Sequence, residues 1–217
     1  MSSFDKTALY TLTYGLFVLT AKEGEKDNGC IVNTVQMLTS DPTRVAVFVN
    51  KSNYTEGMIS RTGIFNVSVL QKDTPFALFK NFGFSSGKDT DKFAGRVYPR
   101  SENGLYYIYE NSNAYLSCKV VGKHDYGTHT LFVGEVLEAK RLSDKKSLSY
   151  DEYLNEVKPK TPAPAVKTDV ANGDAPSAPA QEKWVCKVCG YVHEGPLPDD
   201  FICPWCKHPA SDFERIA

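Results

Sequence analysis

Two closely spaced cysteine pairs near the C-terminus carry the clearest chemistry in this 217-residue sequence. Cys186 and Cys189 stand in "CKVCG", Cys203 and Cys206 stand in "CPWC", and thirteen residues separate the two pairs. Four thiolates at this spacing predict a tetrahedral metal site, which suits either zinc or a single iron. The spacing alone leaves open whether the ion is structural or transfers electrons.

The residues beside the cysteines favour iron. Gly190 follows the second cysteine and lets backbone N–H groups turn toward sulfur, which stabilises the reduced iron–thiolate state. Pro204 makes the second turn rigid. Several aromatic side chains are placed to pack around the centre and exclude water: Trp184, Tyr191, Trp205 and Phe213.

A sharp change of composition after Val157 divides the chain. Residues 158–183 contain five Pro, six Ala and no aromatic residue. Such a segment cannot bury enough apolar surface to offset the entropy lost on ordering, so it reads as a flexible linker. We therefore expect a first domain at 1–157, a linker at 158–183 and a small module at 184–217. A module of this size needs a metal or disulfides to fold, so the four cysteines are expected to bind an ion in either case.

The first domain has the composition of a mainly β fold with short helices. "NYTEGMISRTG" predicts a helix with Thr55 as its cap and Gly63 after its end, and "TPFALFKNFG" predicts another that begins at Pro75. Turn residues in "EKDNG", "SDPT" and "DYGT" separate several strand-like stretches, which together predict a β-barrel. The expected strands cover residues 15–24, 30–38, 44–50, 64–70, 114–124 and 129–142.

The totals exclude several function classes. The formal net charge is −1, so nothing points to nucleic acid as a partner. No apolar run approaches the length of a membrane span and no signal peptide is visible, which predicts a cytoplasmic protein with reduced thiols. Cys30 and Cys118 stand alone in apolar stretches and are expected to be buried and inert.

Three polar stretches interrupt or follow the expected strands: "NTVQ" at 33–36, "NKSNYT" at 50–55 and "FGFSSGKDTDKF" at 82–93. Backbone N–H groups at a helix start, with Ser, Thr and Lys beside them, suit a phosphate. Ordinary caps and turns explain each stretch better when it is taken singly, and the presence of three such stretches in one barrel strengthens the anion-site interpretation only modestly.

The order of these stretches resembles the flavin reductase-like family, the FMN-binding split barrels. The resemblance spans residues 5–145 and rests on "NTVQMLTSDPTRVAVFVNKSNYTEGMI", "GIFNVSVL", "SSGKDTDKF" and "GTHTLFVGEV". It implies a Greek-key split β-barrel and a homodimer with FMN near the subunit interface. It also implies oxidation of NADH or NADPH, without a choice between the two.

The resemblance assigns roles to particular residues. The flavin ring would be lined by Asn33, Thr34, Val35 and Gln36. The phosphate and ribityl chain would be held by Asn50, Lys51, Ser52 and Thr55. The loop that closes over the cofactor or the second subunit would contribute Ser85, Ser86, Gly87 and Lys88. His129 would contact the ring or the nicotinamide, or else simply cap a turn.

The C-terminal module resembles a rubredoxin, in the short form found at the end of rubrerythrins. Lys187 and Lys207 depart from the common rubredoxin pattern. These departures leave the metal-binding fold plausible but put a typical reduction potential of the iron in doubt. A split barrel followed by this module resembles the high-molecular-weight rubredoxins of anaerobic bacteria. That family implies electron flow from NAD(P)H through FMN to one Fe(Cys)4 centre per chain. The acceptor it implies is a flavodiiron protein that reduces nitric oxide or dioxygen.

Two alternative functions remain open. One is an NAD(P)H:flavin reductase that releases reduced flavin and uses a zinc ribbon for docking. The other is a flavin-binding or interaction protein without catalytic activity, with structural zinc. The identity of the metal in the small module separates both from the electron-transfer hypothesis.

Overall fold

The computed structural model describes residues 5–159, 182–186, 191–203 and 209–216. The chain divides into two compact units, Met1–Lys158 and Pro159–Ala217. The predicted linker lies almost entirely outside the described residues, as do Cys189 and Cys206.

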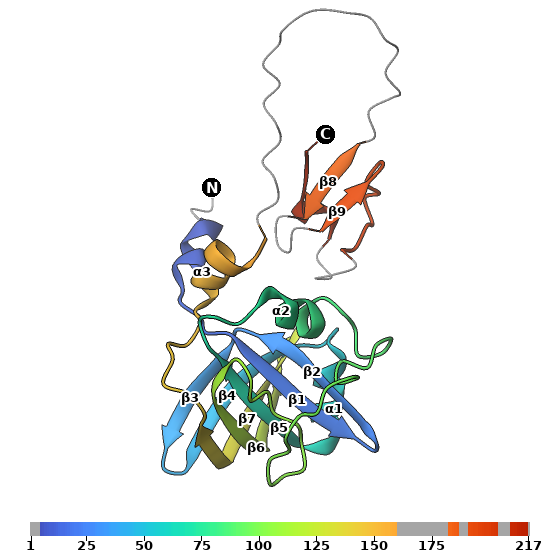
Figure 1. Cartoon of the computed structure of the whole chain (residues 1–217). Coiled ribbons are helices and arrows are strands. Elements are labelled where there is room, and N and C mark those ends of the chain that lie inside the picture. The colour runs from blue at the N-terminus through green and yellow to red at the C-terminus, as the bar shows by residue number, and fades with distance from the viewer. Residues whose placement is uncertain (1–4, 160–181, 187–190, 204–208, 217) are drawn as a thin grey trace, which may run out of the picture. The chain divides into compact units, whose positions relative to one another are not determined.

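Seven antiparallel strands of the first unit form one sheet, in the order β2-β1-β5-β6-β7-β4-β3 (Figure 1). The strands are β1 (Phe17–Glu23), β2 (Lys26–Val32), β3 (Val35–Ser40), β4 (Thr43–Asn50), β5 (Ile64–Leu70), β6 (Ser112–Asp125) and β7 (His129–Arg141). The mainly β fold class predicted from the sequence is confirmed.

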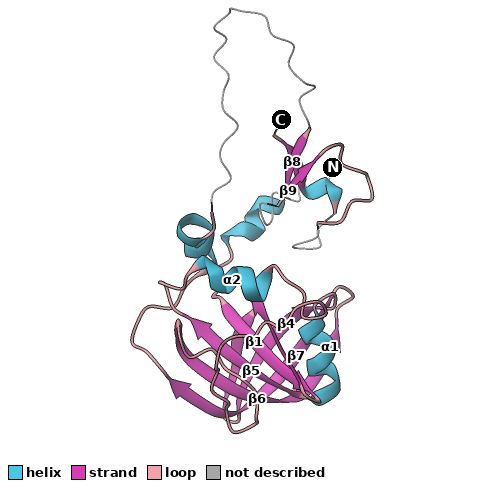
Figure 2. Ribbon diagram, turned by 45° about the vertical axis from the view of Figure 1, so that its right-hand side comes forward, coloured by secondary structure: helices cyan, strands magenta, loops and turns pink. Residues whose placement is uncertain are grey.

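The helices of this unit are short. They are η1 (Lys6–Thr11), α1 (Tyr54–Thr62), α2 (Phe76–Gly83), α3 (Tyr150–Glu152) and η2 (Tyr153–Val157). The helix α1 packs on β1 and β2, and α2 lies across one end of the sheet (Figure 2). Within the described ranges, no helix combines the length and the apolar character that crossing a membrane requires.

A two-residue corner forces the sheet to curl into a barrel. The strands β2 and β3 occupy opposite edges of the sheet, yet only Asn33 and Thr34 separate them in the chain. Six inter-strand spacings would put the edges of a flat sheet about 29 Å apart. The three peptide steps from Val32 to Val35 reach at most about 11 Å. The two edges must therefore approach each other at this corner.

Three local predictions were wrong: the unbroken strand 30–38, the turn at "EKDNG" and the cap of the helix at Thr55. The expected strand 30–38 is divided at the corner, and most of "EKDNG" is strand, because Lys26 to Gly29 pair with β1. The turn is confined to Gly24 and Glu25, where Gly24 adopts a φ of 57°. The helix α1 is capped by Asn53, whose side chain accepts a hydrogen bond from the Thr55 N–H at 3.2 Å.

Two apolar clusters hold the barrel together. One fills its interior and includes Leu19, Val47, Met58, Phe65 and Phe132, all fully buried. The other lies under α2 and the C-terminal segment of the barrel, where the Phe79 and Tyr153 rings pack with centroids 4.5 Å apart. The barrel therefore has a packed core inside and a second packed layer at one end.

The second unit contains a small three-stranded sheet in the order β10-β8-β9. Its elements are β8 (Lys183–Cys186), β9 (Val192–Glu194), η3 (Ala210–Asp212) and β10 (Phe213–Arg215). The rings of Tyr191, Phe201 and Phe213 pack against one another. This aromatic cluster is very small for a stable core, which agrees with a module that needs a metal.

Candidate functional site

The corner between β2 and β3 presents the residues predicted to line the flavin ring. Asn33, Thr34 and Val35 are half-buried there, and Gln36 is exposed at the start of β3. The Thr34 hydroxyl donates to the Phe48 carbonyl at 2.8 Å. The exposed strand that follows carries apolar side chains, with Met37 and Leu38 56% and 51% exposed. An open apolar surface beside polar groups fits a planar ring with a polar edge.

The predicted phosphate-binding residues surround the start of α1. Asn50 accepts a hydrogen bond from the Ser52 N–H at 2.9 Å, which shapes the turn before the helix. Lys51 and Ser52 are exposed. The Lys51 ammonium pairs with Asp125, and this cation holds the pKa of the Asp125 carboxyl below its usual range. An exposed lysine and hydroxyl at a helix start fit an anionic group.

Thr55 has a different position from its three predicted companions. It is fully buried, and its hydroxyl accepts a hydrogen bond from the Asn28 side-chain amide at 2.9 Å. It therefore supports the start of α1 from below the surface.

His129 begins β7 at the same end of the barrel. Its Nδ1 lies 2.9 Å from the Thr128 hydroxyl. The next residue, Thr130, is buried and donates to the Glu56 carboxylate at 2.7 Å, which fixes the start of β7 against the first turn of α1. The structure thus brings His129 and the segment Asn50–Ser52 to neighbouring strand ends, although 76 residues separate Ser52 from His129 in the sequence.

The loop after α2 carries the remaining predicted residues. The Ser85 hydroxyl donates to the Asn81 carbonyl at 2.6 Å, and the Ser86 hydroxyl accepts from the Lys88 N–H at 3.2 Å. Gly87 is buried and Lys88 is exposed. The two serines thus shape the loop, and Lys88 is left to meet a ligand.

Sequence reasoning missed two buried polar residues at this site. Asn28 is 1% exposed and contacts both Thr55 and Gly87. Lys92 is 5% exposed, and its ammonium donates to the Gly29 and Phe82 carbonyls at 2.9 and 3.1 Å. Burial lowers the pKa of Lys92. Asn28 stands in an apparent turn sequence and Lys92 in a polar loop, so neither showed a signal of burial.

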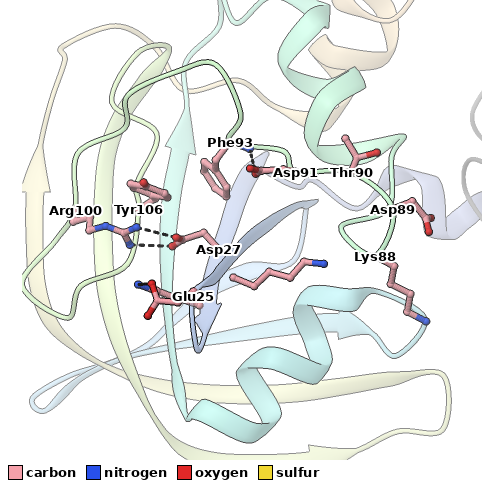
Figure 3. A pocket seen from close by; sticks show the side chains of 11 residues that line it. Glu25, Asp27, Lys88, Asp89, Thr90, Asp91, Phe93, Arg100 and Tyr106 are labelled. Carbon is pink, nitrogen blue, oxygen red and sulfur yellow. Dashed lines mark hydrogen bonds and ion pairs between the residues drawn. The ribbon is translucent and has the colours of Figure 1, made fainter.

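A polar pocket of about 640 Å³ opens beside this loop (Figure 3). Arg100 crosses it with a two-point ion pair to Asp27, at 2.9 and 2.8 Å, and stacks over the Tyr106 ring. Lys88 is the one predicted cofactor residue in its lining. The lining contains charges of both signs: Lys22, Glu25, Lys26, Asp27, Lys88, Asp89, Asp91 and Arg100.

The metal site of the second unit is described for two of its four predicted ligands. Cys186 ends β8 and is 1% exposed, and Cys203 is fully buried. The backbone N–H of Cys186 donates to the Tyr191 carbonyl at 2.8 Å, and Phe213 lies opposite Cys186 in the β8–β10 ladder. Two buried sulfurs beside an aromatic cluster fit a metal bound by thiolates and shielded from water. Cys189 and Cys206 lie outside the described residues.

Comparison with known proteins gives the class. Residues 9–155 match the model of the flavin reductase-like domain, and residues 184–214 match that of the rubrerythrin, rubredoxin-like domain. The chain belongs to the flavin reductase-like family and is an oxidoreductase with a C-terminal rubredoxin-like domain.

Individual relatives sharpen this assignment. The chain is 37% identical to the high molecular weight rubredoxin of Moorella thermoacetica, covering 98% of this chain and 100% of the relative. It is 39% identical to the ferric-chelate reductase (NAD(P)H) of Archaeoglobus fulgidus, over 74% of this chain and 95% of the relative. Among solved structures, nitrilotriacetate monooxygenase component B from Mycobacterium thermoresistibile matches with a TM-score of 0.59 and 25% identity, over 65% of this chain and 78% of that one.

Proposed function

We propose that this protein oxidises NAD(P)H at a bound FMN and passes the electrons one at a time to a single iron held by Cys186, Cys189, Cys203 and Cys206. The main support for this proposal is that one chain contains both the flavin reductase-like barrel and the rubredoxin-like domain. The similarity to a high molecular weight rubredoxin over nearly the whole chain supports the same domain pairing.

The barrel residues have distinct parts in this proposal. The exposed Lys51 and Ser52 bind the flavin phosphate at the start of α1. The corner Asn33–Gln36 holds the ring and leaves one face open for the nicotinamide. His129 orients the nicotinamide or the ring from the neighbouring strand end.

The electron count explains why both domains are needed. A hydride carries two electrons, whereas a single iron accepts one. A bound flavin supplies the link because it accepts electrons in a pair and releases them singly. The balanced reaction is NAD(P)H plus two ferric centres giving NAD(P)+, two ferrous centres and one proton. The four cysteine thiolates would hold the iron, which would supply the one-electron step.

The proposed partners follow from the family resemblance. The barrel forms a homodimer, and the reduced iron delivers electrons to a flavodiiron-type flavoprotein that consumes nitric oxide or dioxygen. Exposed apolar side chains on β3, β4 and β7, among them Met37, Phe48 and Leu137, favour a protein contact on the barrel. A cytoplasmic location is part of the same proposal.

An anaerobic titration of the full-length protein with NADH tests this function. The metal is first measured per chain, and visible spectra then follow the flavin and the ferric–thiolate absorption separately. The expected result is bleaching of both, with about 1.5 NADH consumed per chain at full reduction, because the flavin takes two electrons and the iron takes one. Protein prepared with zinc in place of iron is the matched control, in which only the flavin should respond.

The alternative function predicts a different result. A flavin reductase with a structural zinc ribbon contains zinc as isolated and releases reduced flavin to solution. Iron that stays oxidised while the flavin is fully reduced would rule out the proposed electron path. Flavin that NADH and NADPH both fail to reduce would rule out both enzymatic functions.

A further inference from the structure

The loop from Phe84 to Phe93 is fixed to β2 at two points. At one point, the Lys92 ammonium donates to the Gly29 carbonyl of β2 at 2.9 Å. The Lys92 carbonyl in addition accepts from the Asn81 side chain of α2 at 2.8 Å. At the other point, Gly87 lies directly against the side chain of Asn28. Asn28 and Gly29 are consecutive residues of β2, so the loop follows this strand closely.

Asn28 joins that loop to the start of α1. Its amide nitrogen donates to the Thr55 hydroxyl at 2.9 Å, and the Asn28 side chain is almost completely buried. Its amide oxygen has no hydrogen-bond partner in the part of the chain that the structure describes. That oxygen points at Gly87, because a Cβ on residue 87 would lie 2.1 Å from it.

The contact explains why residue 87 is glycine. A Cβ there would also lie 2.4 and 2.6 Å from the other two terminal atoms of the Asn28 side chain, whereas contacts under 3.0 Å force atoms to move. The backbone of Gly87 does not have the left-handed conformation that would itself demand glycine. The requirement is therefore steric, and the three atoms nearest to such a Cβ all belong to Asn28.

We infer that Asn28 is a positioning residue for the phosphate end of the flavin. It holds the loop Ser85–Lys88 against the segment Asn50–Thr55, so that two separate parts of the chain form one binding surface. The inference rests on the proposed function, because it takes the segment Asn50–Thr55 as the phosphate site and the loop Ser85–Lys88 as the one that closes over the cofactor. Asn28 acts through Thr55 and Gly87, since its unpartnered oxygen is an acceptor and a phosphate offers acceptors only.

The steric clash expected between a side chain at position 87 and Asn28 can be tested, because a second substitution at Asn28 should relieve it. In Gly87→Ala the new methyl group collides with the Asn28 amide and moves the loop away from β2. In Gly87→Ala combined with Asn28→Ala, all three clashing atoms are gone and the loop can return. Gly83→Ala is the matched control, since its Cβ would meet Ile31 at an ordinary 3.4 Å.

Two ligands separate a local effect from a general loss of structure. Dissociation constants are measured for FMN and for riboflavin, which lacks the phosphate, by quenching of flavin fluorescence in the metal-loaded full-length protein. In Gly87→Ala we expect the constant for FMN to rise roughly tenfold and that for riboflavin to change less than about twofold. The double variant should recover at least about half of the lost FMN affinity on a logarithmic scale, and Gly83→Ala should match the wild type.

Each other outcome overturns the inference. If Gly87→Ala weakens FMN and riboflavin equally, the contact serves stability and not the phosphate. If the double variant binds FMN no better than Gly87→Ala, Asn28 is not the residue that restricts position 87. Should Gly87→Ala fail to fold, Asn28→Ala alone is tested: an unchanged preference for FMN over riboflavin then overturns the inference. A wild-type protein that binds FMN, with variants that do not differ from it, overturns this inference but not the proposed function. A wild-type protein that binds no flavin overturns both.

Discussion

Asn50 and His129 lie opposite each other at the last pair of the β4–β7 ladder. Asn50 shapes the turn into α1, and His129 begins the strand whose second residue is hydrogen-bonded to Glu56 in that helix. The resemblance assigns these two residues to different ends of the cofactor site, yet they are neighbours where the adjacent strands β4 and β7 meet the start of α1. Substitutions of His129 should therefore change the rate of the reaction with the nicotinamide.

His129→Ala should lower kcat/KM for NADH about tenfold, the effect of one lost hydrogen bond. The side chain is only half-buried, so the melting temperature should change little. Steady-state kinetics with a soluble electron acceptor measure the effect. His124→Ala, an exposed histidine on β6, is the control and should match the wild type. An equal loss of kcat/KM in the two variants would contradict the assignment of His129 to the site.

Cys186→Ser or Cys203→Ser should reduce the iron content at least tenfold, because a four-thiolate site that loses one ligand no longer holds its metal or its fold. Both tryptophans of the chain, Trp184 and Trp205, belong to the module, so tryptophan emission reports its unfolding separately from the barrel. Reduction of the flavin by NADH should remain within about twofold of wild type. Cys118→Ala, a buried thiol in the barrel, should keep the iron; full iron retention in either serine variant would contradict the ligand assignment.

The carboxyl of Glu152 makes the stability of the barrel depend on pH in the acid range. The Lys146 ammonium, the capping box with Ser149 and the Lys72 ammonium hold the pKa of this carboxyl far below its ordinary value of 4.5. Because the folded protein binds the Glu152 proton more weakly than the unfolded chain does, this stabilisation is complete above pH 4.5 and is lost as the pH falls below it.

Glu152→Gln should therefore lower the free energy of unfolding at pH 7 and flatten its decline below pH 4.5. Urea unfolding at pH 7 and pH 4, followed by far-ultraviolet circular dichroism, measures both changes. Glu25→Gln, at a fully exposed position, should leave the wild-type profile intact. A parallel decline in wild type and Glu152→Gln would show that the carboxyl has no such role.

Lys92→Met should lower the free energy of unfolding by about 1–3 kcal/mol. The substitution leaves the Gly29 and Phe82 carbonyls without their buried donor, and this loss outweighs the relief of no longer burying a charge. Urea unfolding measures the difference. Lys80→Met on the exposed face of α2 is the matched control and should change stability by less than about 0.5 kcal/mol. A stability equal to wild type would mean that the two carbonyls find other donors.

The strands with β-branched and aromatic composition were predictable because each has a simple periodic pattern. The segments 44–50 and 64–70 agree with the structure closely. The corner at Asn33 and Thr34 was not visible, since apolar residues continue on both sides of it and only the closure of the sheet requires a break. "EKDNG" has turn composition, but pairing with β1 overrides local preference.

Burial of polar residues was the main feature that the sequence could not show. Thr55 reads as a helix cap, and only the packing of Asn28 beneath it reveals that its hydroxyl is covered. Lysine is almost never fully buried, so nothing in "DTDKF" indicates that the Lys92 ammonium is buried against carbonyls of β2 and α2. Both depend on contacts between segments far apart in the sequence, which no local pattern contains.

The pairing of β4 with β7 also delays the completion of the barrel during synthesis. The strand β4 ends at Asn50, but its second neighbour β7 begins only at His129. At a translation rate of about 5–20 residues per second, roughly 4–16 seconds pass before that partner leaves the ribosome. Throughout this interval the hairpin of β3 and β4 displays one unpaired backbone edge, and the apolar residues Val45 and Val47 lack their cover. Until β7 is made, this edge of β4 is therefore open to pairing with a strand of another chain.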